Sequence, residues 1–136
     1  MSQFERVDYK DLKPKQQEVY NFQKLASELA DYGFNCIKLS DDWNGADFLA
    51  YKSDVGLTLR VQQKSCPTIQ QNYIGKDLWM AFPIKKYWYL IKHDEFRNLL
   101  DEHTVFLNSP SWKKGKYTIP RASAELIELL TPYRLH

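Results

Sequence analysis

The stretch from Gly45 to Ser65 decides the expected fold of this chain: GADFLAY (45–51), KSDVG (52–56) and LTLRVQQKS (57–65). Two runs rich in apolar residues, separated by a polar turn, predict a β-hairpin. In the second run, Leu57, Leu59 and Val61 alternate with polar residues. Because successive side chains of a strand point to opposite faces, this strand is expected to have an apolar back and a polar front.

The polar front of the second strand carries side chains that can bind ligands, namely Thr58, Arg60, Gln62 and Lys64. In the first strand, Asp47 stands between Ala46 and Phe48, where a solvated surface is not expected. Asp47, Gln62 and Lys64 could therefore converge at one place. The alternative is that the front is only solvated, because antiparallel strands with one face in water carry polar residues at every second position without any function.

Composition limits the classes of protein that this chain can belong to. A length of 136 residues predicts a single domain, 1–136, that is long enough to bury a core. The net charge of +2 is too small to predict nucleic-acid binding by itself, so such binding must rest on local patches. The sequence contains no apolar run of membrane-spanning length and no signal-peptide pattern, which favours a cytoplasmic protein without membrane contact. Cys36 and Cys66 lie far apart without a CxxC pattern, so neither a zinc site nor a disulfide follows.

A long helix is expected before the hairpin, from Pro14 to about Tyr32, with Gly33 as its stop. Its core-facing stripe has helical spacing and consists of Phe22, Leu25, Leu29 and Tyr32. Continued backwards by four residues, the stripe reaches Glu18. This carboxylate lies either at the exposed end of the stripe or is directed at something inside, and the first arrangement is the commoner one.

The remaining elements follow from periodicity and turn residues. We expect a strand at 34–39, a turn-forming loop at 40–45, a polar connection at 68–78, strands at 79–82 and 87–92, a helix at 93–103, a short strand at 105–107, a basic aromatic loop at 108–117 and a helix at 121–130. The acids Asp41 and Asp42 are most simply turn formers, although they could border a cation site. His93 is interpreted as a surface histidine and Asp94 as the N-cap of its helix. This order predicts an α/β (α+β) domain with a central mixed sheet.

Three features of the chain resemble the PD-(D/E)xK nuclease superfamily: the Gly-Ala-Asp run at 45–47, the strand that ends in Val-Gln-Gln-Lys-Ser at 61–65, and the preceding helix. The resemblance is closest to its Mrr-like and Holliday-resolvase-like branches, in which glutamine often replaces the glutamate of the motif. It covers residues 15–66 and continues plausibly to residue 92. It implies a restriction-endonuclease-like αβββαβ core with a central mixed sheet flanked by helices. That core would occupy about 14–107, followed by the basic loop and C-terminal helix at 108–136.

The resemblance also implies roles for individual residues. Asp47 matches the aspartate of the motif, Gln62 stands at the glutamate position, and Lys64 matches the lysine, so these three would form the catalytic centre. The implied ligands of Mg²⁺ or Mn²⁺ are Asp47, the side-chain carbonyl of Gln62, the main-chain carbonyl of Gln63 and, on the first helix, Glu18. Oxygen ligands suit such hard cations, which promote phosphodiester hydrolysis. Ala46 replaces the proline of the motif, and a neutral amide at Gln62 holds Mg²⁺ less strongly than a carboxylate.

Basic residues interleaved with aromatic ones fit contacts with a nucleic-acid backbone and base stacking. The candidate nucleic-acid-binding residues are Arg60, Lys85, Lys86, Lys113, Lys114, Lys116 and Trp112. A solvated basic loop is an equally simple interpretation of the same residues.

Three hypotheses follow. The first is a metal-dependent endonuclease that hydrolyses phosphodiester bonds in DNA, with a homodimer as one way to cut both strands. The second is a catalytically weak or inactive nuclease-fold module that binds nucleic acid or a protein partner, for which Trp79, Trp88 and Trp112 would be exposed aromatic contacts. The third is a small α/β interaction protein whose polar strand face is only solvated.

Overall fold

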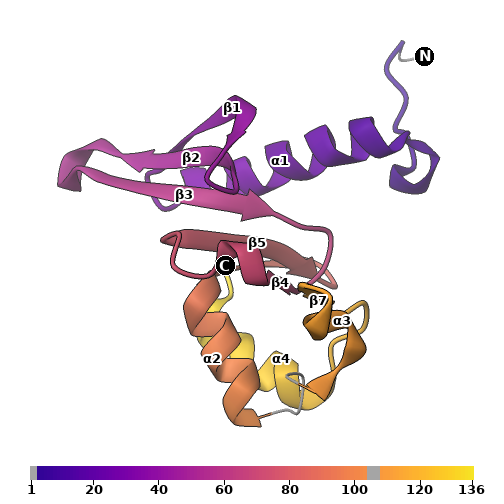
Figure 1. Ribbon diagram of the computed structural model, residues 1–136. Coiled ribbons are helices and arrows are strands. Elements are labelled where there is room, and N and C mark those ends of the chain that lie inside the picture. Colours follow the sequence, from indigo (N-terminus) through magenta and orange to yellow (C-terminus); the bar gives the residue numbers. More distant parts are fainter. Residues whose placement is uncertain (1–2, 104–107) are drawn as a thin grey trace.

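A computed structural model describes residues 3–103 and 108–136 and contains a mixed five-stranded sheet (Figure 1). The spatial order is β1, β2, β3, β5, β6, with bounds Asn35–Trp43, Ala46–Lys52, Leu57–Gln63, Leu78–Ile84 and Tyr87–Lys92. Only β3 and β5 run parallel, and the other neighbours are antiparallel. The expected α/β class with a central mixed sheet is therefore confirmed.

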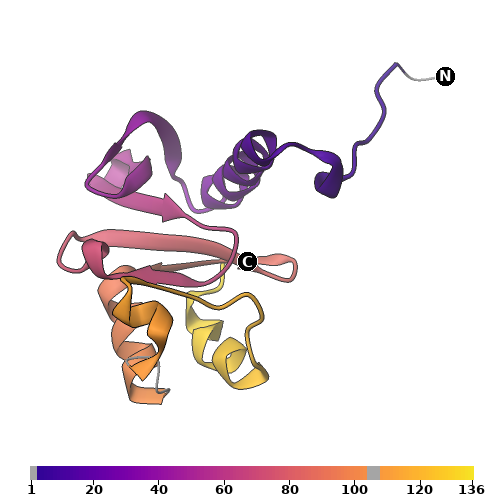
Figure 2. The ribbon, with the colours of Figure 1, turned by 45° about the vertical axis from the view of Figure 1, so that its right-hand side comes forward.

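Helices cover both faces of the sheet (Figures 1 and 2). Helix α1 (Pro14–Ala30) lies on one face, while α2 (His93–His103) and α4 (Ala124–Leu130) lie on the other. A second, two-stranded sheet pairs β4 (Thr68–Gln70) with β7 (Lys116–Thr118), and the short helix α3 (Pro110–Lys113) precedes β7. None of the helices in the described residues combines the length and apolar character needed to cross a membrane.

The expected apolar stripe attaches α1 to the sheet. Leu25 and Leu29 are fully buried against Phe48 of β2 and Val61 of β3. The helix ends at Ala30, two residues before the expected end. The next residues form a Schellman motif, in which the Gly33 N–H bonds the Ala30 carbonyl and the Phe34 N–H bonds the Leu29 carbonyl. Gly33 has φ of 86°, which confirms it as the residue that stops the helix.

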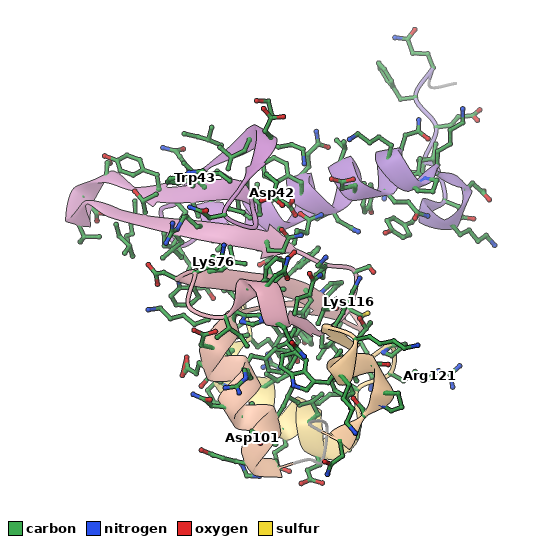
Figure 3. All side chains as sticks on the ribbon, viewed as in Figure 1. Asp42, Trp43, Lys76, Asp101, Lys116 and Arg121 are labelled. Atoms are coloured by element: carbon green, nitrogen blue, oxygen red, sulfur yellow. The ribbon has the colours of Figure 1, made fainter. Side chains whose placement is uncertain are left out.

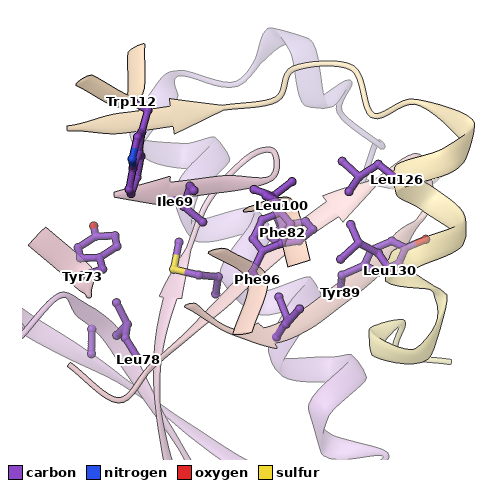
Figure 4. Packing of buried hydrophobic residues seen from close by; sticks show 13 residues of the cluster. Ile69, Tyr73, Leu78, Phe82, Tyr89, Phe96, Leu100, Trp112, Leu126 and Leu130 are labelled. Atoms are coloured by element: carbon purple, nitrogen blue, oxygen red, sulfur yellow. The ribbon is translucent and has the colours of Figure 1, made fainter. Parts of the chain in front are cut away.

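The opposite face of the sheet packs the larger core (Figure 4). Phe82 of β5 stacks on Tyr89 of β6 and on Phe96 of α2, with ring centroids 6.0 and 5.4 Å apart. Trp112 is only 6% exposed in this core, and Trp88 is only 8% exposed on the other face. The expectation of exposed tryptophans at these two positions is therefore wrong, because the sheet is covered on both sides.

The loop expected at 40–45 is wrong, because β1 continues through it to Trp43. The turn consists only of Asn44 and Gly45, whose φ angles of 52° and 90° are typical of a two-residue hairpin turn. The register shifts between Lys38, which pairs with Phe48, and Trp43, which pairs with Ala46. The chain therefore advances five residues along β1 but only two along β2. Residues 39–42 therefore form an irregular segment beside Asp47.

Gly45→Ala is expected to lower the free energy of unfolding by about 2 kcal/mol, measured by urea denaturation. A Cβ at this position would lie 3.0 Å from the Tyr73 ring and 3.1 Å from Leu78, on a backbone with positive φ. Gly56→Ala is the matched control, because its φ is also positive but nothing lies within 4 Å of the added Cβ. An equal loss in both variants would mean that the close contact with Tyr73 contributes nothing.

Two expected loops carry regular structure. The connection at 68–78 contains β4 and a 3-10 turn at Gln71–Tyr73, and the loop at 108–117 contains α3 and the start of β7. These segments are far apart in sequence but pair directly, with Ile69 opposite Tyr117. The crossover from β3 to the parallel β5, residues 64–77, contains no α-helix, although the αβββαβ order implies one there.

The start of α2 also differs from expectation. His93 is only 1% exposed, so its assignment as a surface histidine is wrong. Its Nε2 accepts the Gln70 N–H at 3.0 Å, and its Nδ1 lies 3.0 Å from Asp94 Oδ1. Asp94 is the second helical residue rather than the N-cap, and burial lowers the pKa of His93. This histidine therefore connects α2 to β4.

The other boundaries shift by a few residues. Strand β5 is longer at both ends than the expected 79–82, whereas β6 agrees with expectation. Helix α4 begins at Ala124 rather than at 121, because the Ser123 hydroxyl accepts the Leu126 N–H as an N-cap. The strand expected at 105–107 lies outside the described residues.

Candidate metal and nucleic-acid site

Asp47 and Gln62 stand on neighbouring strands. The β2–β3 pairing ends at Phe48 and Val61, and Asp47 and Gln62 are the next residues on the two strands. Asp47 Oδ2 accepts the main-chain N–H of Gln63 at 3.1 Å, which holds the carboxylate against β3. The structure thus places the Asp47 carboxylate against the main chain of β3, at the residue that follows Gln62.

Gln62 leaves a buried acceptor without a hydrogen bond. The side chain is 7% exposed, and its Nε2 donates to the Gln63 carbonyl at 3.3 Å. Gln62 Oε1 has no hydrogen-bond partner among the described residues. Buried polar atoms nearly always have a partner, and an unpartnered carbonyl oxygen suits a hard cation.

Gln63 connects this position to helix α1. Its side-chain Nε2 donates to the main-chain carbonyl of Glu18 at 3.1 Å, which places the N-terminal half of α1 beside the end of β3. Gln63 Oε1 is also buried without a hydrogen-bond partner in the described chain. The main-chain carbonyl of Gln63, the predicted ligand, accepts the Gln62 amide.

Burial and neighbouring groups together shift the pKa of Asp47. Burial is the largest influence and raises the pKa of Asp47, and the Glu18 carboxylate acts in the same direction. The Gln63 N–H bond and the cations Lys38 and Lys64 oppose this rise. A carboxylate that burial leaves poorly solvated is a favourable place for a compensating cation.

A cavity of about 440 Å³ opens beside Asp47. Glu18 of α1 lines it, together with Asp41 and Asp42 from the irregular part of β1. Asp42 Oδ1 accepts the Gly45 N–H at 2.6 Å, so this acid is both a turn former and a border of the cavity. That these acids border a cation site stays a prediction.

Lys38 and Lys15 also line this cavity, and the sequence analysis did not identify them. Lys38 Nζ pairs with Glu18 at 3.8 Å. Lys38 is a polar residue on a strand without a motif, so only its pairing opposite Phe48 brings it near Asp47. No feature of the sequence distinguishes it from other surface lysines.

Lys64 lies immediately after β3 with its ammonium in a half-buried position. Burial is the main cause that lowers the pKa of Lys64, and Lys116 adds to the effect, whereas Asp47 and Asp42 oppose it. In Figure 3, Lys116 lies beside the chain that leaves β3. Lys64 Nζ is 5.9 Å from the centre of the Tyr73 ring, whose hydroxyl pKa is raised by burial to about 12. The β4–β7 sheet thus carries a second cation toward Lys64.

The other predicted nucleic-acid contacts fall into two groups. Arg60 is occupied: its Nη2 donates to the Lys76 carbonyl at 2.8 Å and lies 3.7 Å from Asp77, while its guanidinium stacks on Trp43. Trp112 is buried and is therefore not available for base stacking. The remaining predicted contacts are exposed, namely Lys85, Lys86, Lys113, Lys114 and Lys116.

The candidate ligands are a carboxylate oxygen, an amide oxygen and a main-chain carbonyl oxygen, which are the kinds of ligand that Mg²⁺ or Mn²⁺ binds. Among the described residues, no group of three or more His, Cys, Asp or Glu side chains is arranged to hold a metal ion. A cation here would therefore take the Asp47 carboxylate together with amide and main-chain carbonyl oxygens, and the unpartnered Gln62 oxygen supplies one of them.

Comparison with protein-family models finds no match for this chain, and a search of curated proteins finds no similar sequence. What the protein does must therefore be inferred from its own residues. Asp47, Gln62, Gln63 and Lys64 are the residues that carry the inference.

Proposed function

We propose that this protein is a metal-dependent nuclease that hydrolyses phosphodiester bonds in DNA, with a core of the PD-(D/E)xK type. The observation that carries the proposal is the buried, unpartnered Gln62 oxygen, one residue from the Gln63 N–H that holds the Asp47 carboxylate. These two residues occupy the ligand positions of the motif, and Lys64 follows in its lysine position.

The arrangement of elements supports a restriction-endonuclease-like core. Helix α1 is followed by the antiparallel strands β1, β2 and β3, and the next strand of the sheet, β5, runs parallel to β3. The short crossover of β4 and a 3-10 turn takes the place of the helix in the αβββαβ order. Asp47 lies on β2 and Gln62 on β3, and both are inner strands of this sheet, which suits a preorganised site.

The residues have distinct tasks in the proposed reaction. When bound, Mg²⁺ or Mn²⁺ would neutralise the negative charge of the pentavalent phosphate and lower the pKa of a bound water. Asp47 and the carbonyl oxygens of Gln62 and Gln63 would hold it. Lys64, with a lowered pKa, can orient the attacking water and accept its proton, or stabilise the developing negative charge. The water oxygen bonds to phosphorus and loses its proton to Lys64 or to solvent, while the bond to one ester oxygen breaks and that oxygen takes up a proton from solvent.

The second candidate is a binding module with the same fold and little or no catalysis. The Lys38–Glu18 ion pair favours it, because it already neutralises one of the proposed ligands. Retained DNA binding without cleavage, unchanged by Asp47→Ala, would support this candidate.

Cleavage assays test the leading proposal. Purified protein with Mg²⁺ or Mn²⁺ is expected to cut single-stranded, duplex or branched DNA, and chelation of the metal should stop the reaction. Absence of cleavage on all three substrates with both metals would contradict the nuclease assignment.

Gln62→Glu is expected to tighten Mn²⁺ binding by about tenfold in calorimetry, because it adds a negative ligand beside Asp47. Without metal the same variant should unfold at a lower temperature, since it buries a second carboxylate. Gln23→Glu, on the exposed surface of α1, is the matched control and should change neither quantity. Unchanged Mn²⁺ affinity in Gln62→Glu would place the metal elsewhere.

A further inference from the structure

A hollow lined by cations and aromatic rings lies between α1 and the β5–β6 turn. It has a volume of about 620 Å³ and shares Ser65, Pro83 and Lys85 with a neighbouring hollow of about 390 Å³ that ends at Arg121. We call the two together the basic trough and define it by the side chains Tyr9, Tyr20, Lys24, Lys85, Lys86 and Arg121. It is separate from the cavity beside Asp47.

The charge of the basic trough is strongly positive. Lys24, Lys85, Lys86 and Arg121 are all exposed, and none of them forms an ion pair in the part of the chain that the structure describes. Glu28 is the one acid among the residues that line it. On a protein whose net charge is only +2, this local excess favours a polyanionic ligand.

Two tyrosines form a platform at one wall of the basic trough. The rings of Tyr9 and Tyr20 are 5.2 Å apart and are 38% and 37% exposed. Asn21 Nδ2 donates to the Tyr9 hydroxyl at 2.8 Å, which holds the first ring against α1, and Lys24 Nζ lies 5.4 Å from the centre of the Tyr20 ring. The Tyr20 ring, packed on the held Tyr9 ring and next to the Lys24 cation, suits a nucleotide, because a base can stack on it while the phosphate pairs with the lysine.

Helix α1 borders both the basic trough and the cavity beside Asp47. Glu18 lines the cavity, and Asn21 and Lys24, one and two turns further along, line the trough. Ser65, which follows Lys64 directly, lies in the wall of the trough. The trough therefore reaches the residue that follows Lys64 in the chain.

We propose that the basic trough binds a single-stranded segment of DNA, with phosphates on Lys24, Lys85 and Lys86 and a base on Tyr20. Unpaired bases have free faces for the tyrosines, whereas the bases of a duplex are stacked on one another. This inference rests on the proposed nuclease function and narrows its substrate to DNA with a single-stranded portion, such as a free end or a flap.

Fluorescence anisotropy tests the trough without cleavage. The probe is fluorescein-labelled oligo(dT) of about 12 nucleotides in EDTA, compared with a blunt duplex of equal length. The double variant Lys85→Ala/Lys86→Ala is expected to weaken binding and to make its salt dependence shallower by about 0.7 for each lysine removed. The control is Lys52→Ala/Lys76→Ala, which removes the same charge at the opposite end of β3 and β5.

Three further variants separate charge and stacking from folding. Lys85 has φ of 58°, so Lys85→Gly removes the charge where glycine adopts the backbone conformation freely. Tyr20→Ala should weaken oligo(dT) binding at least about fivefold, whereas Tyr20→Phe should bind like the wild type. Circular dichroism of each variant checks that the fold is retained.

Each outcome decides between the proposals. A loss confined to the trough variants supports the trough, and equal affinities in the trough and control variants overturn it. Oligo(dT) binding no tighter than duplex binding also overturns it, even when the protein cleaves duplex DNA with Mn²⁺. Trough-dependent binding by a protein that cleaves no DNA with either metal leaves the trough intact and overturns the nuclease function instead.

Discussion

Asp47→Asn is expected to reduce metal-dependent DNA cleavage by at least about 100-fold while the fold stays intact or becomes more stable. Asparagine keeps an oxygen that can accept the Gln63 N–H, but it removes the negative charge that the metal requires. Calorimetry should show loss of Mn²⁺ binding in the same variant. The effect on activity and the effect on stability therefore have opposite signs.

The stability effect follows from the raised pKa of Asp47. Because the folded-state pKa lies above the unfolded value, the folded protein favours the protonated carboxyl, and that stabilisation is lost as the pH rises through the folded-state pKa. Asp47→Asn should therefore exceed the wild type in stability at pH 7, and the difference should shrink as the pH falls below the pKa of Asp47. Urea denaturation at several pH values, without metal, measures this difference.

Asp54→Asn is the matched control for Asp47→Asn. Asp54 is exposed in the 3-10 turn between β2 and β3, at the end of the hairpin away from Gln62. This variant should retain cleavage, Mn²⁺ binding and stability. Wild-type cleavage by Asp47→Asn would show that Asp47 is not a metal ligand and would contradict the proposed function.

Lys64→Met is expected to reduce cleavage by about 100-fold or more while Mn²⁺ binding is retained. Methionine keeps an apolar stem of similar shape next to Tyr73 but lacks the ammonium. The loss should therefore appear in the cleavage rate at saturating metal rather than in the affinity for metal. Lys76→Met, on the exposed chain before β5, is the control and should cleave normally.

The lowered pKa of Lys64 gives this prediction a pH dependence. If the amine accepts a proton from the attacking water, the wild-type rate should rise with pH until Lys64 is deprotonated, and Lys64→Arg should be inactive because arginine stays charged. If the ammonium stabilises the developing negative charge, Lys64→Arg should retain part of the activity. A Lys64→Met variant with the wild-type rate and pH profile would remove Lys64 from the mechanism.

Lys64 should also affect stability in a direction that can be measured. A depressed lysine pKa means that the folded state favours the neutral amine, so this stabilisation is present above the unfolded-state pKa and is lost as the pH falls through the folded-state value. At pH 7 the charged lysine is therefore unfavourable for folding. Lys64→Met should unfold at a temperature equal to or higher than that of the wild type.

Local sequence signals predicted the parts of the fold that depend on near neighbours. The hairpin of β2 and β3, the glycine stop at Gly33 and the α1 stripe of Leu25 and Leu29 all follow from residues within a few positions of one another. The position of Asp47 and Gln62 at the same end of the hairpin belongs to this class too, because a short turn sets the register of the two strands.

Contacts between distant segments were missed for a physical reason. Trp112 and His93 are buried because β4, β7 and α2 pack together on one face of the sheet. The residue pattern within any one of these segments cannot predict that they pack together. The same holds for the extension of β1 to Trp43, since its irregular segment has the composition of a loop.

The sequence by itself determined the class of the fold, the central hairpin and the positions of Asp47, Gln62 and Lys64 along it. Only the tertiary structure decided which charges surround them, because Glu18, Lys38 and Lys116 reach the site from α1, β1 and β7. It also decided the burial that shifts the pKa values of Asp47 and Lys64, and it placed α1 and the β5–β6 turn on two sides of the basic trough. Desolvation and Coulomb interactions depend on distance in space, which an order of residues along a chain does not specify.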